Sequence, residues 1–156
     1  MRAEESRVRL SSELVFNALA TALRDSLDTA RVTVRLRSLD GEGVGLVAEA
    51  LADGVRSMHS GPQEDATKFP TYEFLAQRGE TLVQRDLVQH PVRPPASLIE
   101  FYGTHAQMLA PIRSDGDLVG VLSVHSLEVR DWQQADIAAA ELIARAIAAI
   151  YSASRP

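Results

Sequence analysis

Residues 106–125 leave this chain few choices of fold, because two apolar runs, AQMLAPIRS and DLVGVLSVH, flank a tight turn. Asp115 and Gly116 supply the two positive-φ positions of a type I′ turn, so the runs are predicted to pair as an antiparallel β-hairpin with Ser114 opposite Asp117. Both sides of this hairpin are largely apolar. We therefore expect it to lie at the centre of a sheet that is covered on both faces.

The register set by the turn assigns side chains to the two faces of the hairpin. Counted from Ser114 and Asp117, Met108 is predicted to lie opposite Ser123, with His125 on the same face. The other face is predicted to carry Leu109, Leu122 and Val124. Polar atoms among small residues on the first face indicate a cavity there, roofed by residues 60–105.

Composition excludes several classes of function. At 156 residues the chain suits one domain, and its net charge of -5 argues against nucleic acid as a partner. It contains no cysteine, which excludes disulfides, thiolate nucleophiles and cysteine-linked cofactors and is compatible with a reducing cytoplasm. The first ten residues lack a signal-peptide core, and charged residues interrupt the most apolar segment, 137–151. We expect a cytoplasmic protein without a membrane span.

A helix, two strands and a turn are predicted before residue 52. Ser12 is a suitable N-cap for a helix that ends near Asp28, and residues 1–10 are expected to form a flexible extension or to lengthen this helix. Alternation predicts a strand at residues 32–37, and a turn at 40–43 leads to a second strand at 44–50. Arg35 and Arg37 are expected on the solvated face of the first strand, with anion binding as the alternative.

The middle of the chain is predicted to be irregular. Residues 53–70 show no period, a short helix is predicted at 71–77, a strand at 82–85, a rigid proline-rich loop at 90–95 and a short helix at 97–102. After the hairpin, Asp131 and Gln134 form a predicted capping box that begins a long helix ending near residue 152.

The long helix is apolar around nearly its whole perimeter, and the first helix shows a similar excess. One sheet covers only part of such a surface, and soluble proteins rarely expose large apolar patches. We therefore predict a symmetric homodimer through the first and last helices, with Ala139 and Ala146 as a seam of small residues.

The order of these elements, together with three segments, resembles a GAF domain. The segments are FLAQRGETLVQRD (74–86), MLAPIRSDGDLVGVLSVHS (108–126) and RDWQQADIAAAELIARAIAAI (130–150). The resemblance implies an α+β domain at residues 11–153. In this fold a central antiparallel sheet carries the N- and C-terminal helices on one face and a loop-rich ligand pocket on the other.

The resemblance also implies a class of function. GAF domains bind cyclic nucleotides, haem, bilins, flavins or small effectors, and many dimerise through their terminal helices. The absence of cysteine excludes thiol-based methionine sulfoxide reduction and bilin attachment through cysteine, and the Asn-Lys-x-Asp-Glu pattern of cyclic-nucleotide binders is missing. The function implied is a small-molecule-binding sensor or regulatory domain in signal transduction, without catalysis, that acts through its dimer interface or a downstream regulatory protein.

Two alternatives stay open at this point. One is a haem-binding or enzymatic protein that uses the same cavity, with His90 or His105 as an axial ligand to haem. The other is a dimerisation module with a vestigial pocket.

The predicted ligand site combines the polar hairpin face with aromatic residues of the roof. The four histidines lack the spacing of a metal site, so we predict no metal ligands. Ser123 and His125, two residues apart on a strand, do not form a nucleophile elbow, so we predict no catalytic residues. Arg93, on the proline-rich loop, is expected to be exposed, with pairing to an anionic group as the alternative. The predicted ligand-binding residues are Phe69, Tyr72, Phe74, Phe101, Tyr102, His105, Met108, Ser123 and His125.

Overall fold

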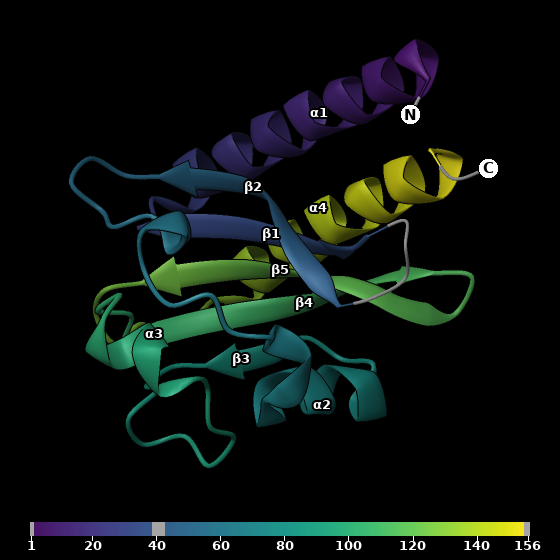
Figure 1. Ribbon diagram of the computed structural model, residues 1–156. Helices are drawn as coiled ribbons and strands as arrows, with labels where there is room; N and C mark the ends of the chain where they lie inside the picture. The colour runs from purple at the N-terminus through teal and green to yellow at the C-terminus, as the bar shows by residue number, and fades with distance from the viewer. Residues whose placement is uncertain (1, 39–42, 155–156) are drawn as a thin grey trace.

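Five antiparallel strands form the middle layer of the structure, a computed structural model that describes residues 2–38 and 43–154 (Figure 1). The strands are β1 (Arg31–Arg37), β2 (Val44–Leu51), β3 (Leu82–Gln84), β4 (Ala106–Ser114) and β5 (Asp117–Ser126). Their order in the sheet is β2-β1-β5-β4-β3. The predicted hairpin, β4 and β5, is therefore confirmed at the centre of the sheet.

Two long helices cover one face of the sheet, and the middle of the chain covers the other (Figure 1). The long helices are α1 (Ala3–Leu27) and α4 (Gln134–Ala153). The layer on the face opposite α1 and α4, which we call the second layer, contains the 3-10 helices η1 (Met58–Ser60) and η2 (Ala66–Lys68) and the helices α2 (Pro70–Arg78) and α3 (Ala96–Glu100). The predicted α+β architecture is thus confirmed. None of the helices in the described part of the chain has the length and apolarity to cross a bilayer.

Both long helices begin elsewhere than predicted. Helix α1 begins at Ala3 instead of near Ser12, so residues 3–10 lengthen the helix, which is the second of the two alternatives expected for them. Helix α4 begins after Gln133 instead of after Asp131. The backbone N–H of Gln133 donates to the Asp136 carboxylate at 2.9 Å and so caps the helix. The predicted turn at 40–43 lies largely outside the described residues.

A one-residue bulge changes the predicted register of the β4/β5 hairpin. The turn itself is as predicted, with Ser114 opposite Asp117. The register then shifts between Ile112 and Arg113, so that Ile112 lies opposite Gly120 and Val119 is the extra residue. A bulge of one residue reverses the face of every later side chain relative to the partner strand.

The bulge makes the prediction for Met108 wrong. Met108 lies opposite Val124 and is 0% exposed, in the main core between the sheet and the two long helices. Leu109, which we predicted against the helices, lies opposite Ser123 and packs in the other layer with Leu75. Side chains of β5 beyond the bulge therefore alternate between the helical core and the second layer.

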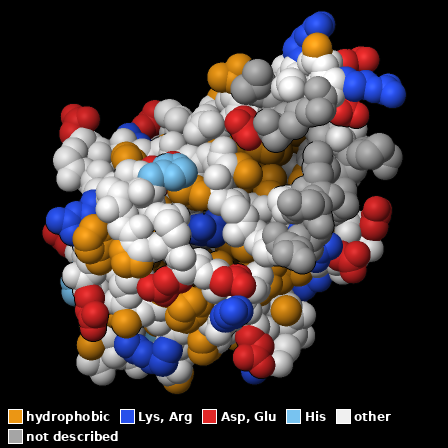
Figure 2. All heavy atoms as spheres, viewed as in Figure 1, with side chains coloured by type: hydrophobic (Ala, Val, Ile, Leu, Met, Phe, Trp, Pro, Cys, Tyr) orange, Lys and Arg blue, Asp and Glu red, His pale blue; other side chains and the backbone are white. Residues whose placement is uncertain are grey.

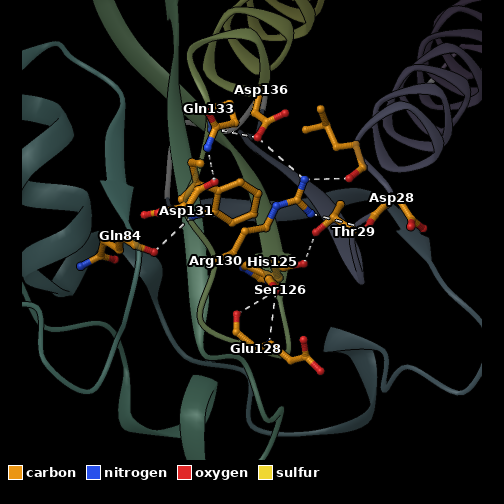
Figure 3. Close-up of polar contacts among 12 residues, drawn as sticks. Asp28, Thr29, Gln84, His125, Ser126, Glu128, Arg130, Asp131, Gln133 and Asp136 are labelled. Carbon is orange, nitrogen blue, oxygen red and sulfur yellow. Dashed lines mark hydrogen bonds and ion pairs between the residues drawn. The ribbon is translucent and has the colours of Figure 1, made fainter.

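Arg130 joins the ends of the two long helices (Figure 3). Its Nη2 donates to the carbonyl oxygen of Leu27 at 2.8 Å and lies 3.8 Å from the carboxylate of Asp136. Its guanidinium also lies over the ring of Trp132, 4.6 Å from the centroid. A cation is favourable at the C-terminus of α1, where carbonyl groups lack helical partners. Arg130 thus holds α1 and α4 in place at one end of the sheet.

We predict that Arg130→Met lowers the free energy of unfolding by about 2 kcal/mol, because charge-assisted hydrogen bonds to buried or capping groups contribute roughly 1.5–3 kcal/mol each. Urea unfolding measures this change. Arg85→Met is the matched control, since the ion pair of Arg85 with Asp131 is largely exposed and such pairs contribute about 0–1 kcal/mol. Equal effects of the two substitutions would contradict the role of Arg130.

Candidate functional site

A cavity of about 90 Å³ lies between the sheet and the second layer, on the face opposite α1 and α4. Strands β1, β4 and β5 form its floor, and residues 58–75 and 95–102 form its roof. In Figure 2, which views the molecule from this side, a Lys or Arg side chain is recessed among uncharged atoms near the middle of the face. The cavity is therefore hydrophobic in part and carries positive charge nearby.

The structure brings four of the nine predicted ligand-binding residues to the cavity wall: Tyr72, Tyr102, Ser123 and His125. It places the other five elsewhere: Phe69, Phe74, Phe101, His105 and Met108. Phe101 packs edge-on against Tyr102 with ring centroids 4.9 Å apart, and Phe74 packs with the Leu75 cluster. His105 uses its backbone N–H to bond the carbonyl of Ser126 at the end of β5. The aromatic roof thus reaches the cavity only through its two tyrosines.

Strand β1 supplies wall residues that the sequence analysis assigned to solvent. Thr33 and Arg35 line the cavity, and the antiparallel pairing of β1 with β5 places Thr33 opposite Ser123 and Arg35 opposite Val121. The expectation of a solvated face is wrong because β1 lies inside the sheet and the segment after β2 crosses its polar side. Alternation alone does not distinguish a face in water from one that lines a covered cavity.

Arg31 is a buried cation that no carboxylate pairs with among the described residues. It is 0% exposed, and its guanidinium donates to the carbonyl oxygen of Arg56 at 3.0 Å, to Thr104 Oγ1 at 3.1 Å and to the carbonyl oxygen of Tyr102 at 3.4 Å. Burial lowers the pKa of Arg31, yet a guanidinium stays protonated in proteins. Its donors are therefore met by neutral oxygens and by His125.

The contact with Arg31 determines the tautomer of His125. Arg31 Nη1 lies 2.9 Å from His125 Nδ1, and because a guanidinium only donates, Nδ1 accepts. Burial, and then the charges of Arg31 and Arg35, hold the pKa of His125 well below its usual range. The ring is therefore neutral with its proton on Nε2, and it offers one N–H donor at the cavity wall.

Hydrogen bonds anchor the roof to the sheet. Glu49 of β2 accepts from Ser57 Oγ at 2.5 Å and from the backbone N–H of Met58 at 2.7 Å. The Tyr102 hydroxyl donates toward the carbonyl oxygen of Met58 at 3.0 Å. Gly61 lies so close to Phe101 that an added Cβ would be 2.3 Å from its ring. These contacts fix the position of the roof above the cavity.

The other polar residues singled out in the sequence have structural roles. Arg93 donates to the carbonyl oxygen of Leu87 at 2.6 Å and so closes the proline-rich loop on itself. His90 Nδ1 accepts from the backbone N–H of Val92 at 3.1 Å. Across residues 2–38 and 43–154, no three His, Asp or Glu side chains are grouped as a metal site requires.

Comparison with known proteins assigns the family. The model of the GAF domain family matches residues 11–150. No curated protein matches the chain. Among solved structures, the blue-light-absorbing form of the PixJ GAF domain from Thermosynechococcus elongatus has a TM-score of 0.76 and 19% identity, covering 98% of this chain and 90% of that one.

Two further structures show the same fold in other proteins. A type II free methionine-R-sulfoxide reductase from Thermoplasma acidophilum has a TM-score of 0.72 and 15% identity, covering 92% of this chain and 94% of that one. The GAF domain of a phosphoenolpyruvate-protein phosphotransferase from Coxiella burnetii has a TM-score of 0.74 and 16% identity, covering 96% of this chain and 91% of that one. With the family model matching most of its length, this chain belongs to the GAF domain family.

Proposed function

We propose that this chain is a small-molecule sensor or regulatory domain that binds its effector in the cavity and does not itself catalyse a reaction. The observation that carries the proposal is the floor of the cavity, where His125 offers an N–H donor and Ser123 a hydroxyl beneath a roof held by hydrogen bonds. Such convergent polar groups in a largely apolar cavity are typical of ligand sites. The similarity in fold to light-absorbing receptor domains is consistent with this proposal.

The size of the cavity favours a small effector over a large cofactor. Its volume of about 90 Å³ compares with roughly 300–1,000 Å³ for pockets that take drug-sized ligands. The chain has no cysteine to attach a bilin. The haem alternative also lacks support, because neither His90 nor His105 lines the cavity.

The chemistry of His125 argues against catalysis by the Ser123 and His125 pair. A general base needs a ring nitrogen that is free to take a proton and a pKa near the working pH. Here Nδ1 is engaged by Arg31, and burial beside positive charge disfavours protonation of the ring. The pair therefore suits ligand binding better than proton transfer.

We predict that native mass spectrometry of the purified protein detects a bound small molecule, and that Ser123→Phe abolishes this adduct because the larger side chain fills the cavity. Ser123→Ala is the control, since it keeps the space and removes only the hydroxyl. Its adduct should persist. A wild-type protein without any adduct, or a folded Ser123→Phe protein with the same adduct, would argue against the cavity as a ligand site.

We also propose that the domain forms a symmetric dimer through the outward side of α1 and α4. The structure covers much of the apolar excess within one chain, because Ile143 and Ile150 pack against the main core and Ala146 is half-buried. Two leucines stay in water: Leu14 of α1 is 72% exposed and Leu142 of α4 is 59% exposed. This outward side, rather than the Ala139 and Ala146 seam, is the surface that a second copy would cover.

Sedimentation velocity at micromolar concentration tests the dimer. We expect a wild-type species of about 34 kDa, twice the 17.0 kDa chain, and at least tenfold weaker association in Leu142→Glu, because a stable interface does not tolerate an unpaired charge at its centre. Leu127→Glu is the control, since Leu127 is also exposed but follows β5. A wild-type species of 17.0 kDa at every concentration would rule out the dimer.

A further inference from the structure

We propose that the cavity binds a short aliphatic carboxylate and that Arg35 pairs with its anionic head. This inference rests on the proposed function, since it takes the cavity to be a ligand site. It goes further by naming the chemical class of the ligand and the side chain that selects it.

Arg35 is a half-buried cation that no described carboxylate contacts directly, and Glu49 and Tyr102 stabilise its charge only from a distance. It lines the cavity, and no hydrogen bond or ion pair joins its guanidinium to another described residue. Burial lowers the pKa of Arg35, which means that its surroundings disfavour the charged form. Desolvating a cation without a partner costs free energy, and an anion seated against it offsets that cost.

The other two arginines of β1 differ from Arg35 in this respect. Arg31 donates to three oxygens and to His125, and Arg37 donates to the carbonyl oxygen of Leu118 at 2.9 Å. Protein groups therefore occupy the donors of Arg31 and engage those of Arg37. The planar fork of Arg35 is left for a partner from outside, and a carboxylate matches that fork with two parallel hydrogen bonds.

The floor beside Arg35 supplies further donors for an anion. Ser123 and Thr33 lie opposite each other on β5 and β1, and both line the cavity. His125, two residues along β5, adds its Nε2–H. Within the described part of the wall the one carboxylate is that of Glu64, which is exposed. Glu49 of β2 offsets part of the positive charge of Arg31 and Arg35 without forming an ion pair with either, and the donors at the floor favour a negative ligand.

The remaining walls determine what accompanies the carboxylate. They are largely apolar, with the polar side chains of Thr71, Ser97 and Gln107 among them, and their apolar residues include Leu75, Leu98, Leu109, Val121 and Met58. The volume of about 90 Å³ is smaller than the roughly 150 Å³ of a cavity that holds benzene. A ligand with a charged head and a short hydrocarbon tail of about two to five carbons fits this division of the walls.

Isobutyrate and its neutral isostere isobutyramide are the probes that test this inference, with binding measured by calorimetry and by the shift in Tm at constant ionic strength. In the wild type we expect isobutyrate to bind at least tenfold more tightly than isobutyramide. Inorganic phosphate, which lacks the apolar tail, should also bind at least tenfold more weakly than isobutyrate. Equal binding of the amide, or equal binding of phosphate, would overturn the proposal.

Two substitutions on β1 separate the role of Arg35 from a general effect of charge. Arg35→Gln should weaken isobutyrate binding at least tenfold, whereas Arg37→Gln, two residues further along the same face, should bind as the wild type does. Unchanged binding by Arg35→Gln would overturn the assignment of Arg35. If Arg35→Gln fails to fold, the comparison of isobutyrate with isobutyramide in the wild type decides.

The outcomes also distinguish this inference from the proposed function. If native mass spectrometry detects an adduct that Ser123→Phe abolishes, but isobutyrate does not bind or binds no better than the amide, the cavity is a ligand site and the carboxylate assignment is wrong. If neither an adduct nor isobutyrate binding is found, both proposals fail.

Discussion

The side chains of β5 point to alternate layers, and the position of one extra residue in that strand decides which of them meet the cavity. Val119 and Leu122 both pack in the helical core although they are three residues apart, which a regular strand does not allow. The bulge at Val119 resolves this conflict and turns Ser123 and His125 toward the second layer. Gly120 belongs to the same arrangement, since a Cβ there would lie 2.1 Å from the carbonyl oxygen of Arg35.

Two arginines of β1 differ in how they meet the cavity floor: Arg31 is hydrogen-bonded within the protein, whereas Arg35 faces the cavity. Arg31 is satisfied by neighbouring oxygens and by His125 Nδ1, so its charge acts at the cavity mainly by keeping the imidazole neutral. Arg35 lines the cavity itself. Behind this floor, Thr29 Oγ1 donates to the backbone carbonyl of His125 at 2.5 Å, and Arg130 holds the end of α1 nearby (Figure 3). The contacts that position the long helices thus also position the polar end of β5.

Much of the fold is predictable from local patterns, whereas the site depends on long-range ones. The turn at Asp115 and Gly116, the strands and the two long helices follow from turn chemistry and periodicity. The bulge does not, because both faces of the hairpin are apolar and the turn alone suggests an unbroken register. The wrong prediction for Met108 follows directly from this bulge, which shifts the register by one residue.

A different reason explains why Arg35 lines the cavity although its strand pattern predicts a solvated face. Polar residues alternate with Val32 and Val34 in the same way whether they face water or a covered cavity. Only the path of residues 53–70, a segment without periodicity, makes the difference, because it places Met58, Pro62 and Ala66 over the floor. The start of α4 was displaced for a local reason, since Asp136 caps the helix from within its first turn.

His125 is a neutral hydrogen-bond donor at the wall of a cavity beside positive charge. Nitrogen NMR of the histidine rings tests it directly, with His125→Asn to assign the signal and isobutyrate as the added ligand. We expect a proton on Nε2 at pH 7, a ring that stays neutral as the pH falls through the ordinary histidine pKa of about 6.5, and a saturable shift of the Nε2 signal with isobutyrate. A proton on Nδ1, protonation near the ordinary pKa, or a signal that isobutyrate leaves unchanged would contradict it.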